Sequence, residues 1–128
     1  METNPLIQAV LKGDAAEVKR LLAIGGDVDA RDRLGFTPLM YAAHEGRAEI
    51  VGLLIANGAD LNARSQDGWT PLMFAVYYGF SAIVQNLLAR GPDLTAKSGD
   101  GRTALDIAKF CGHEAIAKII EERLQRPS

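Results

Sequence analysis

The sequence has almost no cysteine and no long apolar run, and each absence excludes a class of protein. Cys111 is the only cysteine among 128 residues, so the chain cannot form an internal disulfide. No apolar run approaches the roughly 18 residues needed to span a bilayer. The sequence opens M-E-T-N-P-L, with an acid where a secretory signal has basic residues and no apolar segment after it. These features predict a protein of a reducing compartment, most simply the cytoplasm, that does not associate with membranes.

Strong charge of either sign is also missing. The formal net charge is −2, and acids and bases are interspersed. Nucleic-acid binding depends on basic residues that contact phosphates, so a chain without a basic stripe is not expected to bind nucleic acid. Basic residues do occur on successive predicted turns, but aspartates interrupt the row. The basic residues are Arg33, Arg64, Lys97 and Arg102, and the aspartates are Asp32, Asp67 and Asp100.

What the sequence does contain is a motif that recurs every 33 residues. Gly68–Gly79 reads G-W-T-P-L-M-F-A-V-Y-Y-G. The same positions of Gly35–Gly46 read G-F-T-P-L-M-Y-A-A-H-E-G, and those of Gly101–Gly112 read G-R-T-A-L-D-I-A-K-F-C-G. A weaker first copy places Asn4-Pro5-Leu6 one period before Thr37-Pro38-Leu39. Periods of about 20 to 50 residues are typical of repeat proteins, whose units are too small to close a core alone and therefore stack.

Each unit is predicted to contain a turn and two helices. Thr37, Thr70 and Thr103 suit helix N-caps, and each first helix is expected to end at the following motif glycine. Polar tips that end in glycine predict a hairpin-like turn between units. Apolar residues at helical spacing predict the second helices. These are expected over Ala15–Ile24, Ala48–Asn57, Ser81–Arg90 and His113–Arg123.

The expected fold class is therefore an all-α repeat solenoid of stacked helix pairs in a single domain. Four units are predicted, with the terminal units serving as caps. Their approximate ranges are 3–34, 35–67, 68–100 and 101–126.

The motifs T-P-L-M-Y-A-A and T-P-L-M-F-A-V, the 33-residue period and G-A-D-L-N-A at Gly58–Ala63 resemble ankyrin repeats. The resemblance covers about residues 3–124 and implies helix-turn-helix pairs linked by β-hairpin-like turns. One departure stands out, because ankyrin repeats usually carry a histidine after T-P-L that ties the threonine to the neighbouring turn. This chain must hold its turns by other means, since that position is occupied by Ile7, Met40, Met73 and Asp106.

Catalytic and metal chemistry are not expected. A metal site would need His44, Cys111 and His113 together, but His44 lies two units from the other two. Stacked helices about 8–10 Å apart place it about 20 Å away, beyond the reach of a shared zinc ion. Cys111 has no histidine or acid at its site to activate it, and the glycines are explained by turns and helix ends. No enzyme activity, cofactor or metal is predicted.

The resemblance also implies a binding surface, because ankyrin repeats usually bind partners through their turn tips and first helices, which form a concave face. The variable positions of that face hold five of the chain's eight aromatic residues. Tryptophan, tyrosine and arginine are enriched at interface hot spots, and exposed apolar patches usually mark binding sites. The predicted partner-binding residues are Arg33, Phe36, His44, Asp67, Trp69, Tyr77, Tyr78, Asp100, Arg102 and Phe110.

Within this set the five aromatic residues are expected to form one band in the groove, with the charged residues Arg33, Asp67, Asp100 and Arg102 at its rim. Tyr41 and Phe74 are expected in the core instead. The predicted function is a protein–protein interaction module, monomeric when unbound, that binds a protein or peptide through its groove and turn tips. Two alternatives stay open. The same patch could join copies of the chain in a homo-oligomer, or the chain could be an antidote that stabilises a protein encoded nearby.

Overall fold

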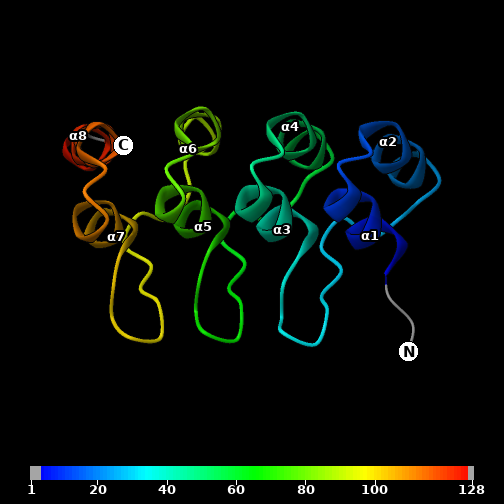
Figure 1. The fold of residues 1–128 in the computed structure, drawn as a ribbon, viewed down its shortest axis with the longest axis horizontal. Coiled ribbons are helices and arrows are strands. Elements are labelled where there is room, and N and C mark those ends of the chain that lie inside the picture. The colour runs from blue at the N-terminus through cyan, green and yellow to red at the C-terminus, as the bar shows by residue number, and fades with distance from the viewer. Residues whose placement is uncertain (1–3, 127–128) are drawn as a thin grey trace.

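The described part of the chain, residues 4–126 of a computed structural model, forms eight helices in two rows (Figure 1). The odd-numbered helices form one row and the even-numbered helices form the other. Three loops extend from the odd-numbered row on the side away from the even-numbered row (Figure 1). They span residues 24–37, 57–70 and 89–103, and we call them the first, second and third turns. The helices are α1 (Pro5–Lys12), α2 (Ala15–Ala23), α3 (Pro38–Glu45), α4 (Ala48–Ala56), α5 (Pro71–Tyr77), α6 (Ser81–Leu88), α7 (Ala104–Phe110) and α8 (Glu114–Gln125).

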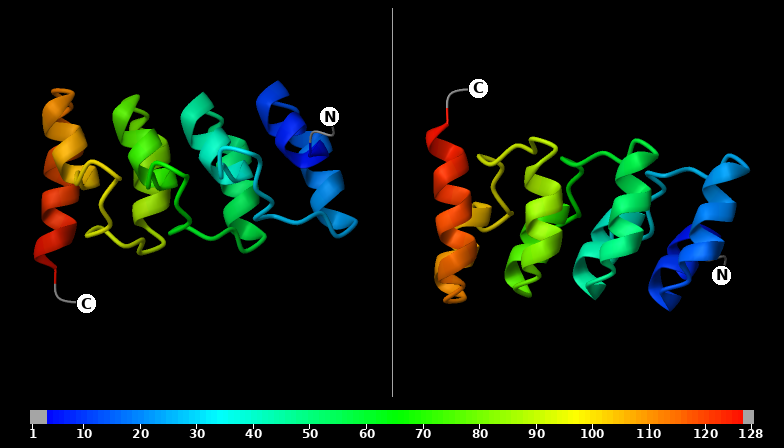
Figure 2. Two further views of the ribbon diagram at one scale, coloured as in Figure 1. Left: turned by 90° about the horizontal axis from the view of Figure 1, so that it is seen from below. Right: turned by 90° about the horizontal axis from the view of Figure 1, so that it is seen from above.

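Consecutive helices pair, and the four pairs stand side by side along the molecule (Figure 2). The predicted all-α solenoid is confirmed, and residues 4–126 contain no β-strand. The four predicted repeat ranges remain a prediction, and the start of the first at about residue 3 lies outside the described residues.

Local sequence sets where the first helices begin and end. Thr70 is the N-cap of α5, where its hydroxyl oxygen accepts a hydrogen bond from the backbone N–H of Met73 at 3.3 Å. Pro71 follows as the first residue of the helix. Thr103 and Asp106 form a capping box on α7, in which each side chain accepts from the other's backbone N–H at 3.1 and 3.0 Å. The predicted threonine caps are therefore confirmed.

The core is one continuous layer of aliphatic side chains between the two rows. Fully buried members come from every pair of helices and include Val10, Val18, Leu39, Leu54, Val84 and Ile120. Phe74 is buried, as expected. The expectation for Tyr41 is wrong, because its ring is only half-buried and its hydroxyl donates a hydrogen bond to the carboxylate of Asp32 on the neighbouring turn. A tyrosine whose hydroxyl bonds a turn carboxylate stays at the edge of the core.

Arginine side chains connect the turns in this chain, which lacks the histidine after T-P-L. Arg31 Nη1 donates to the carbonyl of Gly35 on its own turn at 3.0 Å and to the carbonyl of Arg64 on the next turn at 2.7 Å. Arg64 repeats the pattern one period later, donating to the carbonyls of Gly68 and Lys97. We call these bonds the arginine ladder.

Carboxylate and amide side chains connect the same turns at a second level. Asp29 Oδ1 accepts from the backbone N–H of Asp60 at 2.9 Å, and Asn62 Oδ1 accepts from that of Asp93 at 2.8 Å. Each turn is therefore fixed to the next by side chains that recur in register. Because these bonds link neighbouring backbones, they set the spacing of the turns beside the first helices.

The helix pairs also contact each other through a side chain laid over a glycine. The N-cap residue of α4, α6 and α8 lies over the glycine that follows the first helix of the preceding pair. A Cβ atom built on Gly46 would lie 2.9 Å from the Phe80 ring, and one on Gly79 would lie 2.9 Å from the His113 ring. The His113 ring also contacts the carbonyl oxygen of Tyr77 at 3.2 Å. His113 is thereby explained as a packing residue.

Candidate partner-binding site

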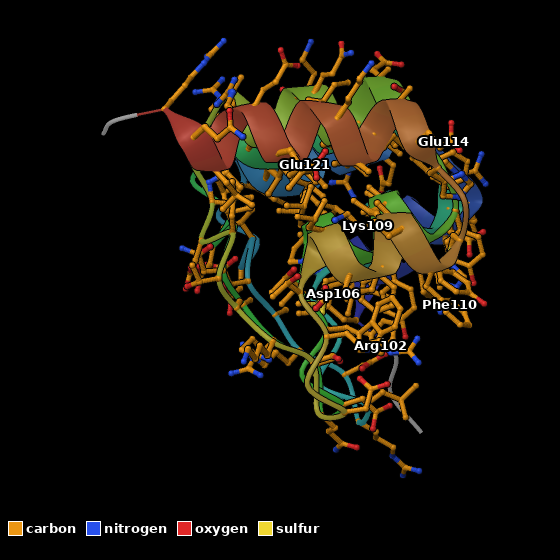
Figure 3. All side chains as sticks on the ribbon, turned by 90° about the vertical axis from the view of Figure 1, so that its left-hand side faces the viewer. Arg102, Asp106, Lys109, Phe110, Glu114 and Glu121 are labelled. Atoms are coloured by element: carbon orange, nitrogen blue, oxygen red, sulfur yellow. The ribbon has the colours of Figure 1, made fainter. Side chains whose placement is uncertain are left out.

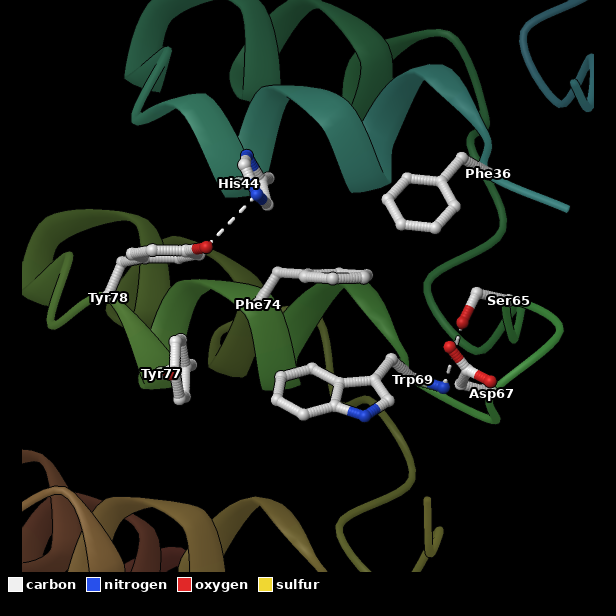
Figure 4. A pocket seen from close by; sticks show the side chains of 8 residues that line it. All are labelled: Phe36, His44, Ser65, Asp67, Trp69, Phe74, Tyr77 and Tyr78. Carbon is white, nitrogen blue, oxygen red and sulfur yellow. Dashed lines mark hydrogen bonds between the residues drawn. The ribbon is translucent and has the colours of Figure 1, made fainter. Parts of the chain in front are cut away.

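A pocket of about 370 Å³ opens between α3, α5 and the second turn (Figure 4). Six of the ten predicted partner-binding residues line it, together with one serine of the turn and one core phenylalanine. The eight lining residues are Phe36, His44, Ser65, Asp67, Trp69, Phe74, Tyr77 and Tyr78.

Phe74 is the floor of this pocket, and the rings of Phe36, His44 and Trp69 pack on it. It is 8% exposed, and its ring centroid lies 5.1 Å from that of Phe36 and 5.2 Å from that of Trp69. The Trp69 ring meets Tyr77 at 5.7 Å, and Tyr77 meets Tyr78 at 4.9 Å, both edge to face. Tilted and edge-to-face rings at these separations stabilise one another. The pocket therefore has a packed aromatic wall.

The two outermost rings of the wall remain open to solvent. Tyr77 is 44% exposed and Tyr78 is 45% exposed, whereas Phe36 and Trp69 are half-buried. Four of the five aromatic residues predicted to form a band are thus brought together.

His44 is held in one orientation at the α3 side of the pocket. Its Nδ1 lies 2.8 Å from the Glu45 carboxylate and its Nε2 lies 3.1 Å from the Tyr78 hydroxyl. Because a carboxylate can only accept, Nδ1 carries a proton, and in the neutral ring Nε2 accepts from the tyrosine. This pair fixes the Tyr78 ring over the pocket.

Asp67 is the one carboxylate that lines the pocket. Its backbone carbonyl accepts a hydrogen bond from Gly99 N–H at 2.7 Å, which connects the second and third turns. Its side chain makes no hydrogen bond or ion pair with any residue in the range 4–126. An unpaired carboxylate therefore stands beside aromatic rings.

Phe110, Asp100 and Arg102 lie outside the pocket, so the prediction of a single five-ring band is wrong in extent. Phe110 is 71% exposed, and the Arg102 guanidinium carbon lies 4.5 Å from its ring centroid (Figure 3). Asp100 pairs with Arg102 at 3.5 Å. The physical reason is a difference between repeats at one position. Arg102 stands where the preceding unit has Trp69, and its guanidinium covers the Phe110 ring.

Arg33 also lies elsewhere, against a second hollow of about 960 Å³ between α1, α3 and the first turn. Its carbonyl accepts from Gln66 Nε2 at 2.7 Å. Arg33 therefore does not rim the aromatic pocket as expected, because the first turn carries it to the α1 side. The hollow is lined by Asn4, Pro5, Ile7, Gln8, Leu11, Arg31, Asp32, Arg33, Leu34 and Tyr41.

In the same hollow, burial raises the pKa of Tyr41 to about 12, and the hydrogen bond to Asp32 and the charge of that carboxylate act in the same direction.

Two pocket residues were not among the predicted site residues. Phe74 is a core residue whose exposed edge also forms the pocket floor, so assigning it only to the core missed half of its role. Ser65 accepts the backbone N–H of Trp69 at 3.2 Å, and Ser98 does the same for Arg102 at 3.2 Å. The recurrence of serine at a spacing of 33 residues was the signal that could have found it.

Neither metal-binding groups nor membrane-spanning helices occur in the described range. Between residues 4 and 126, no three histidine, cysteine, aspartate or glutamate side chains gather closely enough to bind a metal ion. Over the same residues, every helix is too short or too polar to cross a bilayer. Cys111 is a half-buried free thiol.

Comparison with known families agrees with this architecture. A family model described as ankyrin repeats in three copies matches residues 1–65, just over half of the chain, and one described as ankyrin repeats in many copies matches residues 54–108. A search of curated proteins found no significant match. Together with the stacked helix pairs, these matches show that the chain belongs to the ankyrin-repeat family, whose members are generally protein–protein interaction modules and typically non-enzymatic scaffolds.

Proposed function

We propose that this protein is an interaction module that binds a protein or peptide partner through the aromatic pocket and the adjoining turns. The observation that supports this most strongly is the exposure of Tyr77 and Tyr78, at 44% and 45%, on a wall of packed rings. Apart from Phe74, the buried core cluster of residues 4–126 contains no aromatic ring, so folding does not require rings at the surface. Exposed apolar patches of this kind usually mark interaction sites.

The partner is proposed to be a protein because the surface has the composition of an interface core with a charged rim. Tyrosine and tryptophan are enriched at interface hot spots, and Asp67 supplies charge at the edge of the pocket. A partner that covered the pocket and neighbouring turns would bury about 800 Å² on this chain, the standard interface size. With a net charge of −2, the chain has little to attract nucleic acid.

We propose further that binding needs no cofactor, metal or catalysis, that the chain acts in the cytoplasm, and that it is a monomer between partners. The free Asp67 carboxylate supports the monomer, since two copies that met pocket to pocket would place like charges together.

The test begins with capture of proteins from a lysate of the organism that makes the protein, on immobilised wild type and on a Tyr77→Ala/Tyr78→Ala variant. A matched control, Ile24→Ala/Leu124→Ala, removes exposed apolar residues that are 69% and 44% exposed and lie outside the pocket. Each captured protein is then purified and its affinity measured by calorimetry. We expect a partner whose affinity falls at least tenfold with the tyrosine variant and stays unchanged with the control.

Two results would contradict the proposal, and one control is needed to interpret a loss of binding. Equal affinity for wild type and the tyrosine variant would move the site away from the pocket. The control is circular dichroism, which must show that the tyrosine variant folds. If that variant loses helix as well as binding, the affinity is measured with the single variant Tyr78→Ala instead. A mass in light scattering that rises with concentration, and falls back in the tyrosine variant, would identify the pocket as a contact between copies of the chain.

A further inference from the structure

The second and third turns, each taken with the first helix that follows it, carry the same kind of three-residue site, and only one of the two sites is complete. Asp67, Trp69 and Tyr77 stand 33 residues before Asp100, Arg102 and Phe110. Both sets therefore contain a carboxylate at the tip of a turn and an aromatic ring at the end of a first helix. They differ in the middle position, where the site of the third turn has a cation and the site of the second turn has an indole.

At the third turn these residues satisfy each other. The guanidinium of Arg102 lies over the Phe110 ring at 4.5 Å and pairs with Asp100 at 3.5 Å (Figure 3). A guanidinium over an aromatic face is attracted by the ring, and a carboxylate beside it neutralises its charge. The site at the third turn thus shows that this arrangement of carboxylate and ring holds a guanidinium group.

The backbone that carries both sets is the same. Ser65 N–H donates to the Trp69 carbonyl at 2.9 Å and Ser98 N–H donates to the Arg102 carbonyl at 2.8 Å. The hydroxyls of both serines accept from the N–H of the middle residue at 3.2 Å. The two turns therefore present equivalent positions in equivalent places, and the comparison rests on geometry as well as on register.

At the second turn the cation is missing. The Asp67 carboxylate has no partner in residues 4–126. Two basic residues close to Asp67 in sequence or in the same pocket are engaged elsewhere. Arg64 donates to the carbonyls of Gly68 and Lys97, and His44 faces Glu45. The pocket thus combines an unpaired negative charge with rings whose faces attract cations.

We propose that the pocket binds the guanidinium group of an arginine side chain on the partner, with Asp67 as its counter-ion and the aromatic wall as its stacking surface. This assignment rests on the proposed function and names the chemistry of the partner. A planar guanidinium fits better than a lysine ammonium, because it stacks on rings and pairs with a carboxylate through two parallel N–H donors. The pocket volume of about 370 Å³ admits such a group.

The experiment uses three small probes: N-acetylarginine amide, N-acetylcitrulline amide and N-acetyllysine amide. Citrulline has the shape of arginine without its charge. The probes are titrated into the isotope-labelled protein and followed by nuclear magnetic resonance. We expect millimolar binding of the arginine probe, with shifts at the Trp69 indole N–H and the Gly68 amide, and no saturable binding of citrulline.

Two variants carry the quantitative test. Asp67→Asn removes the charge and breaks no hydrogen bond of the fold, so we expect arginine affinity to fall by about three- to fivefold, the range of an exposed ion pair. Asp100→Asn is the matched control at the same position of the next unit, where the internal Arg102 already supplies the cation. It should leave the affinity unchanged.

The proposal is overturned if citrulline binds as tightly as arginine, if lysine binds tighter, or if Asp67→Asn has no effect. Shifts that map to the third turn would also overturn it. These failures leave the proposed function standing whenever the tyrosine variant still loses its partner, because that result requires the pocket but no arginine.

Discussion

At the scale of single residues, Tyr41 joins the edge of the core to the first turn, and this position makes its hydroxyl less acidic. Its pKa is raised to about 12 by burial first and by Asp32 second. We expect a titration of the tyrosinate ultraviolet absorbance to show a step near that pH, and Tyr41→Phe to remove it. Asp32→Asn should lower the pKa of Tyr41 without returning it to the ordinary value of 10, because burial remains.

The direction of the stability effect follows from the raised pKa. A group whose pKa is higher in the folded state contributes stability below its unfolded value, near pH 10, and loses it as the pH rises through 12. Alkaline unfolding should therefore be less steep in Tyr41→Phe than in wild type. Identical alkaline limbs in the two proteins would show that the folded and unfolded pKa values are equal.

Alanine substitutions at Gly46 and Gly112 distinguish the cost of backbone strain from the cost of a side-chain contact between units. Both have positive φ, 72° and 75°, but a Cβ on Gly46 would meet the Phe80 ring at 2.9 Å, whereas one on Gly112 would meet nothing within 4 Å. We expect Gly112→Ala to lower the free energy of unfolding by about 1–2 kcal/mol through the left-handed backbone alone. Gly46→Ala should cost about 1 kcal/mol more, because the ring must move.

Urea denaturation measures both glycine variants. Equal losses would mean that the Phe80 ring moves aside without cost, and that it contributes little to the contact between the second and third helix pairs.

At the scale of the elements, the turns depend on the arginine ladder. Arg31→Ala removes the bonds to the Gly35 and Arg64 carbonyls, and we expect about 1 kcal/mol of lost stability and faster hydrogen exchange in the first two turns. Lys97 stands one period after Arg64 but has no further turn to bond, so Lys97→Ala is the control and should change stability by less than about 0.5 kcal/mol. Equal effects would show that the ladder does not hold the turns.

The helices could be predicted from sequence because their signals are local. Thr70 and Pro71 mark a helix start within two residues, and the apolar spacing of Ile83, Val84 and Leu87 marks its buried partner. The ladder could not be predicted in this way. Arginine at 31 and 64 recurs visibly, but its acceptors are backbone carbonyls of the neighbouring turn, whose orientation is set only by the stack.

The sequence predicted only part of the pocket, because the rest depends on contacts between side chains in the stack. The register of the motif correctly brought Trp69, Tyr77 and His44 to one face. It could not show that Arg102 covers Phe110, because that depends on a contact between two side chains that register alone treats as independent. Arg33 was misplaced because a turn residue can face either neighbour.

On the scale of the whole molecule, helix pairs pack chiefly on adjacent pairs, so stability is a sum over units and their contacts. The first pair has one neighbour, and α2 buries only Val18, whereas α4 buries four residues. We expect amides of α2 to exchange faster with solvent than those of α4 and α6. Uniform protection across the three helices would show that the stack opens as a single unit.

Trp69 is the only tryptophan, and it lies in the aromatic wall beside Tyr77, in the interior of the stack. The molecule therefore carries one fluorophore at one place, and the light it emits reports only on the second and third units. Ellipticity, by contrast, counts helical residues wherever they are. The difference between the fluorescence and ellipticity melting curves measures how much helix the terminal units lose before the middle units unfold.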